Sequence, residues 1–102
     1  MAFNGTEGGL ISLETGADMT ERYRSKNPDE IKGHFFGKDV LQEILDQEGC
    51  MGIRMYYGLD EDYNKALVIV GADASENDMT SKVGDISLPC PSVCSAPNDL
   101  NS

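Results

Sequence analysis

Residues 37–72 read GKDVLQEILDQEGCMGIRMYYGLDEDYNKALVIVGA, and this stretch decides the fold. Four apolar residues in its first third recur at helical spacing, which predicts a helix over residues 38–48 with Gly49 as its stop. Residues 51–57 then alternate with the period of a half-buried strand. Residues 66–72 are apolar on both faces and indicate a second strand, so a helix is followed by a strand pair.

The segments before this stretch carry further helical signals. Residues 10–26 have a moderate helical pattern with Ser12 as a candidate N-cap, although Gly16 weakens its middle. This pattern predicts one helix or two short ones. Residues 27–28 (Asn-Pro) suit the cap and first position of another short helical segment, which should end near Gly33.

The segments after it are less regular. Residues 73–82 are polar and indicate a loop, and alternation over residues 83–88 predicts a third, short edge strand. Prolines from position 89 onward exclude an interior strand there. Helices before strands predict an α+β fold, in which two or three N-terminal helical segments pack on a small two- or three-stranded antiparallel sheet.

A chain of 102 residues has room for one domain with a modest core. We expect a flexible N-terminus over residues 1–9, a single α+β domain over residues 10–88, and an irregular tail containing proline and cysteine over residues 89–102. The expected core residues are apolar members of these elements: Leu13, Phe35, Phe36, Val40, Leu41, Ile44, Leu45, Ile53, Met55, Leu67, Val68, Ile69 and Val70.

The charge balance limits the classes of partner. Eighteen acidic and eight basic residues give a net charge of −10, a field that repels phosphate backbones and anionic lipid. We therefore expect that neither nucleic acid nor a membrane is a partner, whereas the negative charge is compatible with binding to a basic protein. The first residues lack the basic and apolar regions of a secretory signal, so the sequence predicts a cytoplasmic protein.

Cysteine and histidine offer the first candidate chemistry. Cys90 and Cys94 lie in a PCPSVC segment, where a turn could close a small disulfide, although free thiols are the expectation in a reducing cytoplasm. With Cys50 and His34 they would have the ligand count of a closed zinc site, but their spacing carries no metal signature. We expect the cysteine pair to be dispensable for folding.

Carboxylates offer weaker candidates. Asp60, Asp62 and Asn64 have the oxygen spacing that opens a calcium loop, but the later positions of that loop fail, so a hairpin turn is the better interpretation. An enzyme built from carboxylates, for example Glu43 and Asp46 with Tyr56, is neither supported nor excluded. No cofactor loop is recognisable.

Arginine and tyrosine form the most interface-like group in the chain: Arg54, Tyr56, Tyr57 and Tyr63. These residue types are enriched at binding hot spots, although tyrosine also favours strands for packing reasons. Alternation places Arg54 and Tyr56 on one strand face, opposite to Ile53 and Met55.

The sequence therefore predicts a small acidic, non-enzymatic interaction module that binds a protein partner or associates with itself as a homodimer. An inhibitor or immunity-type protein that masks a basic partner is a sharper form of this hypothesis, because the net charge would steer such an encounter. The alternatives are a thiol- or metal-dependent protein that uses Cys90 and Cys94, and a carboxylate-based enzyme.

Overall fold

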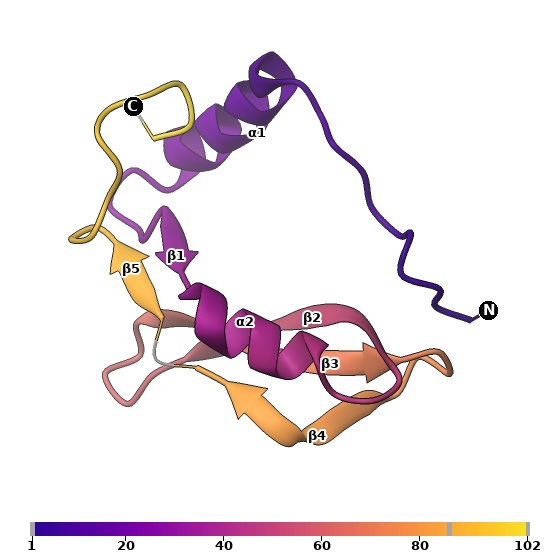
Figure 1. Ribbon diagram of the computed structural model, residues 1–102. Coiled ribbons are helices and arrows are strands. Elements are labelled where there is room, and N and C mark those ends of the chain that lie inside the picture. Colours follow the sequence, from indigo (N-terminus) through magenta and orange to yellow (C-terminus); the bar gives the residue numbers. More distant parts are fainter. Residues whose placement is uncertain (1, 86, 102) are drawn as a thin grey trace. The chain divides into compact units, whose positions relative to one another are not determined.

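A computed structural model describes residues 2–85 and 87–101, so the expectations for residues 1, 86 and 102 lie outside it. Over the described part the fold is α+β, with two helices and antiparallel sheets of two and three strands (Figure 1). The elements in chain order are α1 (Leu13–Lys26), β1 (Gly33–Phe35), α2 (Lys38–Leu45), β2 (Cys50–Leu59), β3 (Lys65–Asp73), β4 (Asp78–Gly84) and β5 (Leu88–Cys90).

Residue contacts divide the chain into two compact units. Unit 1 comprises Met1–Gly8 and Phe36–Ser87, and unit 2 comprises Gly9–Phe35 and Leu88–Ser102. The domain boundaries predicted from the sequence stay a prediction. Each unit is described by itself below.

The sheet of unit 1 is a meander of the strands β2, β3 and β4 in that order. β2 and β3 pair from Cys50 opposite Asp73 to Leu59 opposite Lys65. β3 and β4 form a shorter ladder whose register shifts between Val70 and Gly71. The sheet thus has two outer edges of very different regularity, one on β2 and one on β4.

Both hairpins of this sheet close with the same five-residue turn, and the turn that follows β2 illustrates it. Asp60 N–H donates to the carbonyl of Asn64 at 2.9 Å, and Tyr63 N–H donates to the carbonyl of Asp60 at 3.0 Å. Asp60 Oδ1 accepts from the N–H groups of Asp62 and Asn64, both at 2.9 Å. Tyr63 has φ +64°, in the left-handed region that favours glycine.

The turn after β3 repeats this geometry with Asp73 in the first position. Asp73 Oδ1 accepts from the N–H groups of Ser75 at 2.9 Å and Asn77 at 3.0 Å. Glu76 takes the left-handed position, with φ +71°. The sequence pattern Asp-x-x-x-Asn therefore specifies both turns through an aspartate that caps its own loop.

The core of unit 1 lies between α2 and one face of the sheet. α2 contacts all three strands, and its Ile44 is 1 % exposed, opposite Ile69 of β3 at 0 %. Gly71 and Gly84 let the helix approach closely, because a Cβ on Gly71 would lie 3.3 Å from Ile44 Cγ2. Val70 and Ala72, on the other face of β3, are buried as well.

Unit 2 combines α1 with the short pair of β1 and β5. Ser12 caps α1 by accepting from Thr15 N–H at 3.0 Å, as the sequence predicts. Asn27 ends the helix, where its side chain and its N–H both donate to the carbonyl of Tyr23. No residue of α1, which the structure describes in full, is buried.

Several local expectations need correction. The predicted helical segment at residues 27–33 is a turn that leads into β1, and α2 ends at Leu45 rather than at residue 48. The third strand of the large sheet is β4 at Asp78–Gly84, not residues 83–88, because the Asp73 turn returns the chain earlier than the polar composition indicates. The expected irregular tail begins with β5, which pairs with β1.

Some predicted core positions are exposed. The exposed fractions are 58 % for Leu13, 61 % for Phe35, 43 % for Leu45 and 57 % for Met55. Apolar alternation predicts which face of an element a residue occupies, but not whether another element covers that face. α2 has only eight residues, and Met55 is not covered.

Candidate functional site

The second half of β2 is the most exposed apolar segment of the sheet. Met55 is 57 % exposed, Tyr57 96 % and Leu59 62 %, and these three share the sheet face on which α2 lies, because they alternate with Arg54 and Tyr56. No charged residue and no proline lies among residues 55–59. We call residues 55–59 the open edge.

The backbone of the open edge has hydrogen-bonding groups that point away from the sheet. Antiparallel pairs alternate between hydrogen-bonded and non-hydrogen-bonded, and the Asp60–Asn64 pair is hydrogen-bonded. The pairs Gly58–Ala66 and Tyr56–Val68 therefore exchange hydrogen bonds, whereas Met55, Tyr57 and Leu59 direct their N–H and C=O groups outward. No strand pairs with this side of β2 among the described residues.

The opposite edge of the sheet is protected. Val70 and Gly71 are neighbours on β3, but their partners on β4 are Val83 and Met79, so residues 80–82 have no partner in the ladder. Such an irregularity increases the local twist of the edge strand, which hinders pairing with a further strand. Lys82 on β4 also forms an ion pair with Glu43 at 3.1 Å. The devices that usually block an edge are thus present on β4 and missing from the open edge.

A charged network stabilises the sheet face opposite α2. Arg54 on β2 pairs with Asp78 on β4 and donates to the carbonyl of Glu76 at 3.2 Å. Tyr56 donates to Asp78 Oδ2 at 2.5 Å. These contacts connect the two outer strands across β3. Glu76, whose carbonyl accepts from Arg54, is also the residue in the left-handed conformation.

The same network shifts three pKa values. The hydrogen bond from Tyr56 and the ion pair with Arg54 lower the pKa of Asp78, because both stabilise the carboxylate. The hydrogen bond to Asp78 raises the pKa of Tyr56, because ionisation would remove the donated proton. The hydrogen bond with Asp78 likewise raises the pKa of Arg54.

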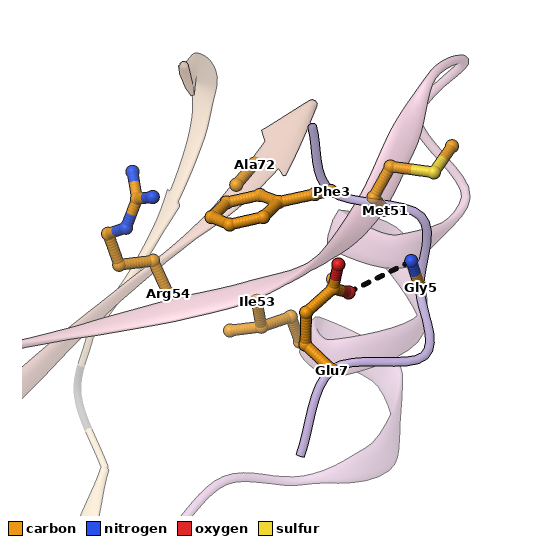
Figure 2. A pocket seen from close by; sticks show the side chains of 8 residues that line it. Phe3, Gly5, Glu7, Met51, Ile53, Arg54 and Ala72 are labelled. Carbon is orange, nitrogen blue, oxygen red and sulfur yellow. Dashed lines mark hydrogen bonds between the residues drawn. The ribbon is translucent and has the colours of Figure 1, made fainter. Parts of the chain in front are cut away.

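The N-terminal segment of unit 1 covers the first half of β2. Phe3 N–H donates to the carbonyl of Ala74 at 3.0 Å, and the Phe3 ring lies 5.4 Å from the Arg54 guanidinium carbon. Phe3, Glu7 and Met51 line a hollow of about 340 Å³ (Figure 2). Residues 51–54 are half-buried, so the open edge begins where this covering stops.

Glu7 organises this segment through its own backbone. Its carboxylate accepts from the N–H groups of Asn4 at 2.9 Å and Gly5 at 3.0 Å. These backbone hydrogen bonds lower the pKa of Glu7. The hollow therefore has its charged groups already engaged and offers no convergent polar site.

The structure separates the four predicted interaction residues. Arg54 and Tyr56 lie together on one face, as expected, and both contact Asp78. Tyr57 points to the other face as part of the open edge, and Tyr63 occupies the left-handed position of the following turn at 80 % exposure. The group is thus two surfaces rather than one.

The carboxylate candidates serve structural contacts. Asp60 accepts hydrogen bonds from the N–H groups of its own turn. This is what the hairpin interpretation of the calcium-like spacing predicts. Glu43 pairs with Lys82 and Asp46 accepts from Gln42 at 2.7 Å, both on the α2 side of the sheet, away from the face that carries Tyr56. The structure does not bring the suggested enzyme residues together.

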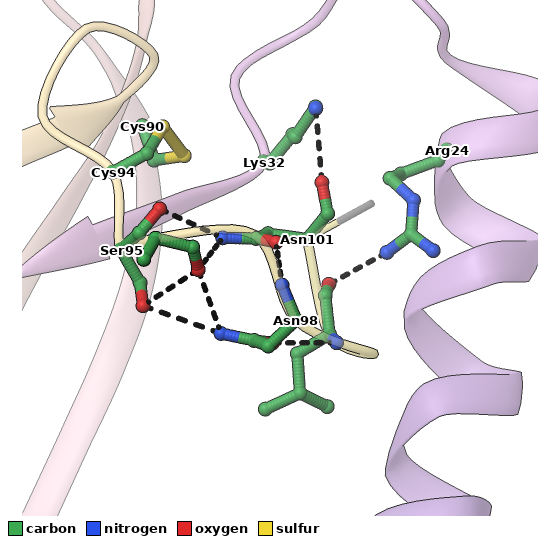
Figure 3. The surroundings of a disulfide bond; sticks show 9 residues. Arg24, Lys32, Cys90, Cys94, Ser95, Asn98 and Asn101 are labelled. Carbon is green, nitrogen blue, oxygen red and sulfur yellow. Dashed lines mark hydrogen bonds between the residues drawn. A yellow bond between two sulfur atoms is a disulfide. The ribbon is translucent and has the colours of Figure 1, made fainter.

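Cys90 and Cys94 form a disulfide in unit 2 (Figure 3), so the expectation of free thiols is wrong for this structure. His34 lines the same hollow as the disulfide, whereas Cys50 belongs to unit 1 and is a free thiol. Disulfide-bonded sulfur cannot serve as a thiolate ligand. Within residues 2–85 and 87–101, no three histidine, cysteine or acidic side chains form a metal-binding group.

The C-terminal segment of unit 2 is bound through its carbonyl groups. Arg24 of α1 donates to the carbonyl of Leu100 at 2.6 Å, and Lys32 donates to that of Asn101 at 3.2 Å (Figure 3). These contacts and the disulfide hold the C-terminal segment in place.

No family model, curated protein or solved structure matches this chain. Of the helices in the described residues, none has the length and apolar character needed to span a membrane.

The sequence-based interpretation missed three residues that define the site. The sequence pattern predicts Met55 to be a core residue, ends the strand before Leu59 and predicts a loop at Asp78. The structure instead exposes Met55 and includes Leu59 in β2 and Asp78 in β4. The available signal was the absence of lysine and proline from residues 55–59, because a peripheral strand normally carries one of these protective residues.

Proposed function

We propose that this protein is a non-enzymatic interaction module that binds an extended protein segment at the open edge. The segment would add to the sheet as a strand beside β2, a recognised mode of peptide recognition. The observation that carries this proposal is that Met55, Tyr57 and Leu59 combine highly exposed side chains with outward backbone groups.

The backbone groups and the side chains of the open edge would contribute to recognition in different ways. Backbone hydrogen bonds would supply sequence-independent affinity, and the side chains of Met55, Tyr57 and Leu59 would contact alternate residues of the added segment. Tyrosine is frequent at binding hot spots because a rigid ring gives a large contact area at low entropic cost.

Charge favours a neutral or basic partner segment. The net charge is −10, and residues 60–62 (Asp-Glu-Asp) directly follow the open edge. A basic residue at the matching end of the added segment would be attracted, whereas an acidic segment would be repelled. This keeps the inhibitor or immunity-type hypothesis within the proposal.

A display selection with a random peptide library tests the proposal. Wild-type protein should enrich peptides that alternate apolar residues and lack acidic ones. Tyr57→Pro should abolish their binding, because proline removes an outward N–H without removing a bond of the β2–β3 ladder. Leu59→Lys should weaken the same binding by placing a protective charge on the edge.

Val83→Pro is the matched control for this test. Val83 is 57 % exposed on the other outer strand, and its partner Val70 directs its hydrogen bonds to β2, so the Val83 N–H also points outward. Circular dichroism should show that both proline variants remain folded. Equal loss of peptide binding in both variants, or no enriched peptide at all, would refute strand addition at the open edge.

A further inference from the structure

We infer that the segment added to the open edge is the open edge of a second copy of this chain, antiparallel to the first and centred on Tyr57. This inference rests on the proposed strand addition and names its partner. The two sheets would join into one continuous sheet across a two-fold axis, the commonest symmetry of soluble homo-oligomers.

The backbone pattern of the open edge is complementary to itself. In an antiparallel pair centred on Tyr57, Tyr57 lies opposite Tyr57 of the second copy, and Met55 lies opposite Leu59. All three residues direct their N–H and C=O groups outward, so each pair is a hydrogen-bonded one. The exposed side chains of both copies also meet on the same face.

Charge favours this register, because it sets a basic residue opposite an acidic one. With Tyr57 at the centre, Arg54 of each copy lies opposite Asp60 of the other, and both belong to the face opposite α2. The guanidinium of Arg54 already pairs with Asp78 on β4 and donates to the carbonyl of Glu76, so this register sets a basic residue opposite an acidic one without a second ion pair. The repulsion between chains of charge −10 is screened beyond roughly 8 Å at physiological salt.

The N-terminal segment excludes a register shifted further toward the start of β2. In a pair centred on Met55, Leu59 of one copy would lie opposite Met51 of the other. Phe3 and Gly5 already line the hollow beside Met51, and a Cβ on Gly5 would lie 3.5 Å from the Met51 carbonyl oxygen. The register centred on Tyr57 keeps the second copy clear of that segment.

Single-cysteine cross-linking tests both the partner and the register, in a Cys50→Ser background that removes the free thiol. Tyr57→Cys should form a disulfide-linked dimer, because hydrogen-bonded antiparallel partners lie about 5.5 Å apart between Cα atoms, within the range of a disulfide. Leu59→Cys should not cross-link to itself, because its two copies would lie roughly 14 Å apart. A mixture of Met55→Cys and Leu59→Cys should cross-link.

Sedimentation of the unmodified chain supplies the independent measurement. As the concentration rises from about 20 to about 200 micromolar, the mass should rise from 11.1 kDa toward twice that value. Tyr57→Pro should remain monomeric over the same range, and Val83→Pro should behave as wild type. Peptides selected at the open edge should also return the dimer to monomer.

The results separate this inference from the proposed function. One possible result is a wild-type chain that stays monomeric at 200 micromolar and still binds peptides in a way that Tyr57→Pro abolishes. That result would refute the homodimer and leave the proposed strand addition standing. Self-cross-linking of Leu59→Cys as fast as that of Tyr57→Cys would overturn the register. A monomer that also binds no peptide would overturn both.

Discussion

Substitution of Gly84 by alanine should destabilise unit 1, because the site has no room for a methyl group. An added Cβ would lie 2.7 Å from Ile69 Cγ1, 3.1 Å from Ile69 Cδ1 and 3.3 Å from Val40 Cγ2. Optimal carbon contacts are near 3.5–4.0 Å. Ile69 is fully buried, so it cannot rotate into solvent, and either α2 or β4 must move.

The expected size follows from two opposing effects. Overpacking a core by one methyl group costs typically about 1–3 kcal/mol. Replacing glycine by alanine in a compatible conformation returns about 0.4–1 kcal/mol through the unfolded chain. The Gly84→Ala variant should therefore lose about 1–2 kcal/mol in the free energy of unfolding.

Gly58→Ala is the matched control, since it makes the same change elsewhere in the sheet. A Cβ on Gly58 would lie 3.7 Å from Val68 Cγ2, an ordinary contact, so this variant should gain up to about 1 kcal/mol. Urea denaturation monitored by circular dichroism should show opposite shifts in the two midpoints. A Gly84→Ala midpoint at or above wild type would refute the close packing of α2 on β4.

Three further predictions concern single contacts. Tyr63→Gly should raise the free energy of unfolding by roughly 0.5–1 kcal/mol, because a left-handed non-glycine residue costs about 1–2 kcal/mol and the greater chain entropy of glycine offsets part of the gain. An unchanged urea midpoint would contradict the turn geometry. The hydrogen bond from Tyr56 lowers the pKa of Asp78, so this group stabilises the fold above its unfolded pKa of about 3.9 and the effect is lost as the pH falls through the lower folded value. Asp78→Asn should therefore show a flatter loss of stability during acid titration than wild type, and equal slopes would count against the network. Replacing Cys90 and Cys94 together by serine should destabilise unit 2 by about 2 kcal/mol, the loop-entropy value for a separation of 4 residues. A change below about 1 kcal/mol would favour the sequence-based view that the pair is dispensable.

Local sequence signals predicted elements of both units where side-chain chemistry alone determines them. The Ser12 cap and the pairing of residues 51–57 with 66–72 follow from capping and apolar alternation. Gly49 does not end the helix as predicted, because α2 ends at Leu45. The α+β class follows from the order of these elements. Each of these depends on neighbours within a few residues.

The features that were missed depend on contacts distant in sequence. Whether Met55 is covered depends on the length of α2, and whether Asp78 belongs to a strand depends on a turn that a polar composition disguises. The pairing of β1 with β5 joins segments more than 50 residues apart, and no local pattern specifies such a partner. The open edge is therefore defined by the exposure and the register of β2, and the sequence alone predicts only its residue types.

The pairing of β1 with β5 has a consequence for how this chain can be rebuilt. Phe35 lies directly opposite Leu88, so the chain departs into Phe36–Ser87 and comes back through adjacent backbone positions, roughly 5 Å apart. That geometry is the one that hosts of inserted domains provide at their loops. Unit 2 thus carries most of unit 1 as an insertion between two neighbouring backbone positions, so a longer or shorter insertion at this point need not disturb the pairing of β1 with β5.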